Sequence, residues 1–180
     1  MNFCSHCGAP VVTRIPPGDH LPRHVCDNCG SIHYQNPKVV VGALAVWEDR
    51  ILMCRRAIEP RHGFWTLPAG FMENNESTPE GACRETLEEA GARISLEGMF
   101  SYVDIPRISQ IHIIYRARLL DLNFAAGEES LEVKLVDESE IPWEHIAFHS
   151  IEFTLRRFLE DRKRGHFGLH TTRLEPRSYS

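Results

Sequence analysis

Residues 70–92 read GFMENNESTPEGACRETLEEAGA, and this stretch predicts one helix with clear boundaries. Ser77 and Glu80 match the capping box that opens many helices. Pro79 is tolerated there because the first turn needs no intrahelical amide donor. Gly91 is well placed to end the helix in a left-handed conformation. The stretch therefore predicts a helix of about fourteen residues, which is an ordinary length.

Three glutamates crowd one face of this helix. Glu85, Glu88 and Glu89 occupy positions i, i+3 and i+4, where like charges repel by about 0.2–0.5 kcal/mol per pair on an exposed surface. A divalent cation such as Mg²⁺ or Mn²⁺ reverses that balance, because it prefers hard oxygen ligands. The alternative is a solvated acidic face with an Arg84–Glu88 pair at i, i+4. The helix taken alone does not decide between the two.

The complete spacing resembles the Nudix box of the Nudix hydrolases. The shared positions are Gly70, Glu76, Arg84, Glu85, Glu88, Glu89 and Gly91. Seven identities at fixed spacing, each met at about 7% by chance, would arise about once in 10⁸ starting points. Thr86 and Ala92 stand where the family prefers an aliphatic residue, and Leu-Pro-Ala-Gly precedes the box where Gly-Gly is frequent. These are packing positions, so the departures leave the expected ligands intact.

This resemblance implies a fold, a chemistry and a set of roles. The fold is α/β, the Nudix α/β/α sandwich around a mixed sheet. The chemistry is metal-dependent hydrolysis of a nucleoside diphosphate linked to another moiety. Glu85 and Glu89 are implied to ligate Mg²⁺ or Mn²⁺, and Glu88 to ligate metal or orient water. The resemblance also implies roles for three other residues. Arg84 orients the helix carboxylates, Glu76 either ligates metal or pairs with Arg84, and the Gly70 carbonyl ligates metal.

The box does not identify the general base. Glu129 and Glu132, in EESLEVKLV, are the candidates from outside the box. Glu132 is the one we expect to be catalytic. The alternative is that Glu132 is a surface charge, because it shares a strand face with Lys134.

Four cysteines before the box predict a small zinc ribbon. Cys4 and Cys7 repeat the C-x-x-C-G pattern of Cys26 and Cys29, with eighteen residues between the pairs. Two such turns bring four sulfurs around one tetrahedral ion. Two disulfides are the alternative, which the lack of a secretory leader pattern disfavours. Because four sulfurs complete a structural site, we expect none of the nearby histidines His6, His24 and His33 to bind the metal.

The remaining pattern supports one α/β domain after the ribbon. Residues 39–47 form a continuous apolar run, 110–120 and 130–136 alternate, and 149–164 has helical spacing. We expect a zinc ribbon at 1–35, a Nudix domain at 36–164 and a C-terminal tail at 165–180.

The substrate is predicted less directly than the family. YQNPKVVVGAL, GFWTLPAGFME and DIPRISQIHIIY resemble the FAD and ADP-ribose pyrophosphatase group of ribbon-bearing Nudix enzymes. The other such group, the NADH pyrophosphatases and RNA NAD-decapping enzymes, carries an aromatic-proline motif that residues 101–119 lack. Phe71, Arg107 and Gln110 are the candidate substrate-binding residues, and surface or core roles explain them equally well. Trp65 and Tyr115 could also stack on a base or simply fill the core.

Composition narrows the partners. The 180 residues carry a formal charge of −5, which provides no overall basic field for nucleic acid, and no apolar run is long enough for a membrane helix. We therefore expect neither nucleic-acid binding nor membrane association, and the lack of a secretory leader pattern predicts a cytosolic location. The resemblance implies a small nucleotide substrate. The resemblance adds a homodimer. A non-catalytic nucleotide sensor that uses the ribbon to bind nucleic acid or a partner is the alternative from another functional class.

Overall fold

The computed structural model describes residues 1–175, and the chain forms two compact units. The first runs from Met1 to Pro37 and the second begins at Lys38. The first unit contains a small antiparallel sheet of β1 (Val12–Arg14), β2 (Arg23–Val25) and β3 (Ile32–His33).

Two tight turns with the same geometry hold the cysteines of the first unit. In each turn, the amide of a glycine donates a hydrogen bond of 2.9 Å to a cysteine carbonyl: Gly8 to Cys4, and Gly30 to Cys26. Both glycines have positive φ, +75° and +73°, which a residue without Cβ adopts at little cost. This explains why glycine follows each cysteine pair.

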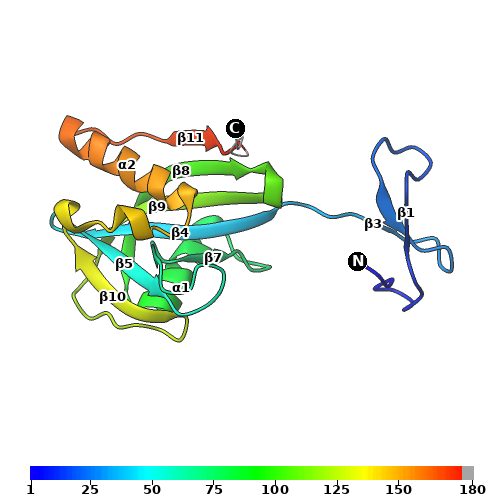
Figure 1. The fold of residues 1–180 in the computed structure, drawn as a ribbon, viewed down its shortest axis with the longest axis horizontal. Helices are drawn as coiled ribbons and strands as arrows, with labels where there is room; N and C mark the ends of the chain where they lie inside the picture. The colour runs from blue at the N-terminus through cyan, green and yellow to red at the C-terminus, as the bar shows by residue number, and fades with distance from the viewer. Residues whose placement is uncertain (176–180) are drawn as a thin grey trace. The chain divides into compact units, whose positions relative to one another are not determined.

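The second unit is built on an eight-stranded mixed sheet (Figure 1). Six strands follow one another in the order β10-β5-β4-β9-β8-β11, while β6 pairs with β5 and β7 with β4. The β4–β9 and β8–β11 pairs are parallel and the others are antiparallel. The strands are β4 (Lys38–Trp47), β5 (Arg50–Arg56), β6 (Trp65–Thr66), β7 (Ala69–Phe71), β8 (Ile94–Ile105), β9 (Gln110–Leu119), β10 (Ser130–Val136) and β11 (His170–Arg173).

One helix covers each face of this sheet (Figure 1). Helix α2 (His149–Arg164) packs Ile151 and Leu155 against Leu44 of β4. Helix α1 (Thr78–Ala90) packs against smaller residues, among them Ala43. The predicted α/β/α sandwich around a mixed sheet is therefore confirmed. Among the described residues, neither helix has the length and apolar character needed to cross a membrane.

The boundaries of α1 follow the predicted signals. The Glu80 carboxylate accepts a hydrogen bond of 2.8 Å from the Ser77 amide, as in a capping box. Gly91 has φ of 60°, and its amide donates to the Leu87 carbonyl at 2.8 Å. A Cβ at Gly81 would come within 2.7 Å of Val41, so glycine lets α1 approach the sheet closely.

The segment expected to be a tail contains the edge strand β11. It pairs in parallel with β8, and Nε2 of His170 donates a 2.7 Å hydrogen bond to the buried carboxylate of Asp161 in α2. Residues 165–175 therefore belong to the fold, and the rest of the expected tail lies outside the described residues.

Candidate active site

The three box glutamates differ in their surroundings. The side chains of Glu85 and Glu89 point toward the sheet, and these residues are only 8% and 6% exposed. The side chain of Glu88 is 59% exposed. Spacing of i, i+4 aligns the two buried carboxylates one helical turn apart, whereas i+3 turns Glu88 toward solvent. The predicted acidic face therefore consists of two buried carboxylates, those of Glu85 and Glu89, and one exposed carboxylate, that of Glu88.

Arg84 connects the carboxylates of the box. Its guanidinium donates to Glu76 and Glu85 at 2.8 Å and to Glu88 at 2.9 Å. It also donates to the Phe71 carbonyl at 3.2 Å. Such charge-assisted bonds fix the geometry of both partners. Arg84 is thus placed to orient the helix carboxylates, as the resemblance implied.

Glu76 is occupied by this arginine. Its two oxygens accept bonds from Arg84, and one of them also accepts the Glu73 amide at 2.7 Å. These bonds, with Arg84 first, lower the pKa of Glu76 to about 2. Of the two roles left open for Glu76, the structure displays the pairing with Arg84.

Glu89 is held in place although its charge is disfavoured. Burial raises the pKa of Glu89 to about 7, and the charges of Glu85 and Glu129 add to that rise. A hydrogen bond from the Ala69 amide and the charge of Arg56 oppose it. Burial also raises the pKa of Glu85, partly offset by Arg84. A cation between these carboxylates would favour their charged forms and so oppose both pKa shifts.

The local backbone fits a site for a hard divalent ion. A Cβ at Gly70 would collide with the carboxylate of Glu85, so a larger residue in β7 would displace this carboxylate from its present position. The available donors are carboxylate and carbonyl oxygens, which suit Mg²⁺ or Mn²⁺. Among the His, Cys, Asp and Glu side chains of residues 1–175, however, only the four cysteines bring three or more ligand atoms close enough together to hold one ion. The box carboxylates stand further apart, with Glu85 and Glu88 each paired to Arg84.

The structure separates the two candidates for the general base. Glu129 is exposed beside the box, and its charge raises the pKa of both Glu85 and Glu89. Glu132 pairs with Arg55 across the β10–β5 ladder. Lys134, two residues after Glu132 on β10, has its ammonium 4.6 Å from the ring centre of Trp65.

That register places Glu132 on the wrong face of the sheet for catalysis at the box. Lys134 pairs with Met53, which belongs to the core beneath α2, whereas Val133 pairs with Cys54 beneath α1. Side chains of a strand alternate between faces, so Glu132 shares the face of Lys134. The expectation that Glu132 acts as the base is therefore not supported, and Glu129 has the better position.

Two expected substrate-binding residues lie at one end of the sheet. Phe71 follows Gly70, is 50% exposed, and has the ammonium of Lys38 4.9 Å from its ring centre. Gln110 is paired with Lys38 in the β4–β9 ladder, and its side-chain oxygen bonds to His112 at 3.0 Å. This group adjoins the box, because the Phe71 carbonyl accepts the bond from Arg84.

The other aromatic and basic candidates have different surroundings. Arg107 is exposed on the short helix η1 (Pro106–Ile108). Trp65 is buried in the core beneath α2, so it serves packing there. Tyr115 is buried in the core beneath α1, and its hydroxyl bonds to Thr78 at 2.7 Å.

Sequence reasoning missed Arg56, the last residue of β5. It is only 9% exposed, and its charge opposes the rise in the Glu89 pKa. The strand alternation of Leu52, Cys54 and Arg56 could have indicated it, because the first two face α1.

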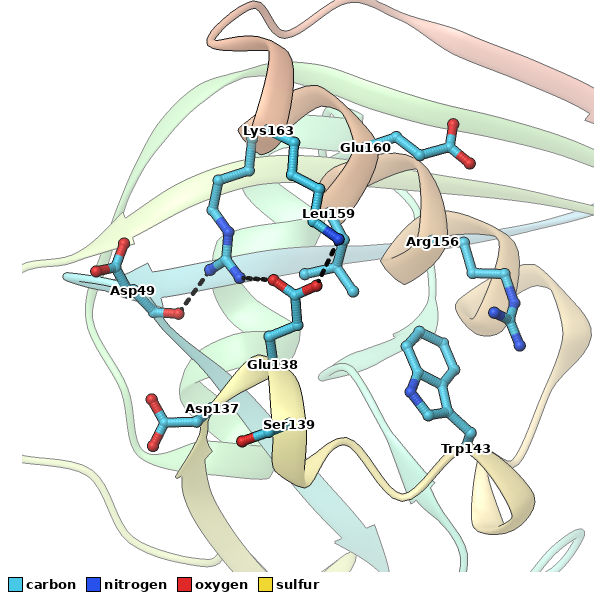
Figure 2. A pocket seen from close by; sticks show the side chains of 10 residues that line it. Asp49, Asp137, Glu138, Ser139, Trp143, Arg156, Leu159, Glu160 and Lys163 are labelled. Atoms are coloured by element: carbon cyan, nitrogen blue, oxygen red, sulfur yellow. Dashed lines mark hydrogen bonds and ion pairs between the residues drawn. The ribbon is translucent and has the colours of Figure 1, made fainter.

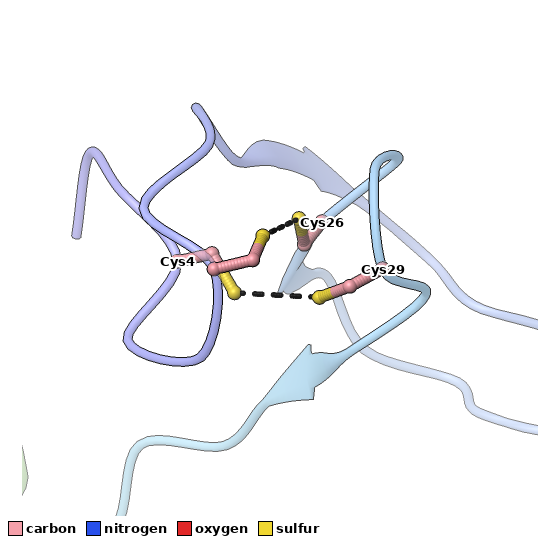
Figure 3. Close-up of side chains that lie close together, drawn as sticks. Cys4, Cys26 and Cys29 are labelled. Atoms are coloured by element: carbon pink, nitrogen blue, oxygen red, sulfur yellow. Dashed lines mark hydrogen bonds between the residues drawn. The ribbon is translucent and has the colours of Figure 1, made fainter.

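The four ribbon cysteines form the second candidate centre (Figure 3). Their sulfurs lie within 4.8 Å of one another, with 3.6 Å between Cys4 and Cys29 and 3.5 Å between Cys7 and Cys26. Tetrahedral zinc with bonds of about 2.3 Å requires sulfurs about 3.8 Å apart, so the cluster fits that ion. All four thiols are free, which excludes the disulfide alternative in this structure. A ring nitrogen of His33 lies 3.3 Å from the Cys4 sulfur, the position of a hydrogen-bond partner.

A large groove of the second unit is lined by no residue of α1. It encloses about 1080 Å³ between the β4–β5 turn, the short helices η2 (Glu138–Glu140) and η3 (Trp143–His145), and α2 (Figure 2). Glu138 accepts bonds from Arg162 at 2.7 Å and from Lys163 at 2.9 Å. Arg156 lies over the ring of Trp143 at 4.3 Å. The groove contains none of the box residues, and three of its charged side chains, Glu138, Arg162 and Lys163, pair with one another.

Comparison with known proteins places this geometry in context. The family model described as Nudix N-terminal matches residues 2–35, and the NUDIX domain model matches residues 36–160. The crystal structure of a NUDIX hydrolase from Nitrosomonas europaea is 53% identical, with a TM-score of 0.92 over 97% of this chain and 100% of that one. An ADP-ribose pyrophosphatase of Methanocaldococcus jannaschii is 31% identical over 113 residues, which is 61% of this chain and 67% of that protein.

A second kind of relative shares a shorter region. The NAD-capped RNA hydrolase NudC of Chromobacterium violaceum is 34% identical over 92 residues, which is 51% of this chain. The match spans only a third of the length of that relative, 33%.

Proposed function

Because the chain belongs to the Nudix hydrolases and carries their N-terminal zinc ribbon, we propose that it cleaves the pyrophosphate of a dinucleotide or ADP-sugar. FAD and ADP-ribose are the preferred substrates of this proposal, and the products are two monophosphates. The observation that carries it is the buried pair Glu85 and Glu89, placed one helical turn apart beside Gly70. The relative named ADP-ribose pyrophosphatase supports the substrate class.

The reaction requires neutralisation of the pyrophosphate charge. We propose that Glu85, Glu89 and the Gly70 carbonyl hold Mg²⁺ or Mn²⁺, with Glu88 as a further ligand or water-orienting group. When bound, such an ion screens the phosphates and acidifies the attacking water. Arg84 keeps Glu85 and Glu88 oriented through its bonds of 2.8 and 2.9 Å.

Glu129 is the proposed proton acceptor. Its carboxylate takes a proton from water, the water oxygen bonds to one phosphorus, and the anhydride P–O bond breaks to release the second phosphate. Its support is its charge coupling to both buried glutamates. Phe71 and Gln110, with Arg107 further along, are proposed to contact the part of the substrate beyond the pyrophosphate.

A substrate panel tests this function. Purified protein is assayed with Mg²⁺ and with Mn²⁺ against FAD, ADP-ribose, NADH, NAD-capped RNA and nucleoside triphosphates. We expect turnover of FAD or ADP-ribose into two monophosphates. Preferred turnover of NADH or NAD-capped RNA would favour the activity named for the NudC relatives. Tight binding of one ligand without turnover would favour a sensor.

The assembly is a separate proposal. We propose a homodimer, on the resemblance to related pyrophosphatases. Light scattering should give twice the mass of one chain, and a single-chain mass would contradict it.

A further inference from the structure

Arg56 is a nearly buried cation at the end of β5, whose middle residues Ile51–Cys54 are apolar. Arg56 is only 9% exposed, and a single exposed residue, Arg55, separates it from the buried run Ile51–Cys54. Removing a guanidinium from water costs free energy unless anionic or hydrogen-bonding partners compensate. The position therefore needs an explanation in terms of what this cation binds.

The protein fixes the orientation of this guanidinium from one side. Its Nε donates to the Pro60 carbonyl at 2.9 Å, and its central carbon lies 5.1 Å from the ring centre of Phe148. The backbone of Arg56 is also fixed, because its amide donates to the Phe64 carbonyl and its own carbonyl accepts the Gly63 amide, both at 2.9 Å. A stacked, anchored guanidinium is pre-organised to present its remaining donors in a defined plane.

Those remaining donors are available. Within residues 1–175, the only hydrogen bond of the Arg56 side chain is the one from Nε to Pro60. No enclosed side-chain nitrogen or oxygen in the same residues lacks a partner. The two terminal nitrogens must therefore reach solvent, where a ligand can approach them.

The terminal nitrogens of Arg56 lie on the side of the sheet that α1 and its box glutamates cover. Arg56 follows Cys54 by two residues, and Cys54 packs beneath α1 with Ala90. Ser130, the neighbour of Glu129, pairs with Arg56 across the ladder. The positive charge of Arg56 opposes the rise in the pKa of Glu89. A cation with free donors thus stands beside a carboxylate site for a phosphate-bearing substrate.

We propose that Arg56 binds a phosphate group of the substrate through its terminal nitrogens. Planar guanidinium matches two oxygens of one phosphate, and it supplies positive charge from the protein side of the anhydride. This inference deepens the proposed function and depends on it for the identity of the phosphate. The competing explanation is that Arg56 only anchors the loop 57–64 through its bond to Pro60.

Arg55 provides a matched control for that alternative. It is exposed, its Nε donates to the carbonyl of Gly63 at 3.0 Å in the same loop, and it pairs with Trp65 on the other face. Loss of loop anchoring alone would therefore affect Arg55→Gln and Arg56→Gln alike. Loss of phosphate binding would affect only Arg56→Gln.

The experiment compares both variants with the wild type in hydrolysis of FAD or ADP-ribose, in calorimetric binding of AMP, and in thermal stability. For Arg56→Gln we expect kcat/KM and AMP affinity to fall by about 10- to 100-fold, the loss of one or two charge-assisted hydrogen bonds. Arg55→Gln should stay within about threefold of the wild type. If Arg56→Gln does not fold, Arg56→Lys, which keeps the charge but not the planar fork, should show the affinity loss in a folded protein.

The outcomes separate this inference from the proposed function. Equal effects of the two variants, or a change in melting temperature alone, would overturn the phosphate role while leaving hydrolysis intact. If the wild type does not hydrolyse the substrates but its AMP binding still depends on Arg56, the proposed function is overturned and the phosphate site is kept. Wild type that neither hydrolyses the substrates nor binds AMP would overturn both.

Discussion

The backbone amide of Ala69 donates a 3.1 Å hydrogen bond to the carboxylate of Glu89, joining β7 to the last turn of α1. The bond explains how a carboxylate that is 6% exposed keeps a defined position. It also gives the Leu-Pro-Ala-Gly turn a structural role, because that turn presents the amide. Glu89 is thus positioned by a neutral donor, the Ala69 amide, which does not fully offset the cost of burying its negative charge. A bound cation would offset that cost.

Replacing Glu89 by Gln should separate chemistry from folding. The amide keeps an oxygen for the Ala69 bond but loses the negative charge, so we expect metal-dependent hydrolysis to fall by about three orders of magnitude, or several kcal/mol. The fold should survive. Glu88→Gln, at an exposed position, is the control and should retain the stability of the wild type.

The same variant has a defined pH signature in metal-free protein. Since the pKa of Glu89 is raised to about 7 from an ordinary value of 4.5, the folded state binds more protons between these values. Stability of the wild type should therefore fall as pH rises from 4.5 to 7, and Glu89→Gln should lack that component. Urea unfolding at several pH values measures the difference. Identical pH profiles for both proteins would refute the assignment.

Glu129 and Glu132 offer a test of the general base. Glu129→Gln should lower kcat by about 10²–10⁴-fold, the usual contribution of a positioned base. Glu132→Gln changes the same group on the opposite face of the sheet and should leave kcat within about twofold. Steady-state kinetics at saturating metal decides, and a larger loss in Glu132→Gln would restore Glu132 as the candidate.

How much could be predicted from the sequence depended on the range of the contacts. The ends of α1 are encoded locally by Ser77 and Gly91, so the box helix was predicted well. Strand alternation predicts that Glu132 and Lys134 share a face, but which helix covers that face is set by the pairing of Lys134 with Met53 in the β10–β5 ladder. That pairing joins two strands that are far apart in the sequence, so no local signal predicts it.

Long-range contacts produced the other differences. The site of Arg56 depends on Phe148, which is distant in sequence. The strand β11 depends on its parallel pairing with β8, which is distant in sequence. The alternation in β5 indicates the face of Arg56 but not its contact with Phe148, and residues 170–173 carry no strong periodic pattern that predicts a strand.

His112 should make stability depend on pH in the opposite sense. Burial lowers the pKa of His112 to about 4, and its nitrogens bond to Ser150 at 2.9 Å and to Gln110 at 3.0 Å. The unfolded chain binds its proton from about pH 6.5, so this contribution is complete above 6.5 and is lost as pH falls toward 4. It amounts to on the order of 3 kcal/mol. His112→Asn should flatten this part of the urea-unfolding profile, and an unchanged profile would contradict the assignment.

Removal of zinc should unfold the ribbon and spare the second unit. A unit of this size has little core, so metal binding supplies most of its folding energy. We expect one zinc per chain by mass spectrometry, and loss of NMR dispersion confined to residues 1–37 after chelation or in Cys26→Ser. Ser substitution of Cys83, which lies outside the cluster, is the control. Full zinc content in Cys26→Ser would contradict the predicted ligand set.

The most direct measurement is anomalous diffraction at the manganese edge from crystals soaked with Mn²⁺ and a slowly hydrolysed ADP-ribose analogue. We predict an anomalous peak within ligation distance of carboxylate oxygens from Glu85 and Glu89, next to the phosphates of the analogue, and its loss in Glu89→Gln crystals. Manganese peaks confined to other surfaces, with Glu85 and Glu89 unligated beside bound analogue, would contradict the account.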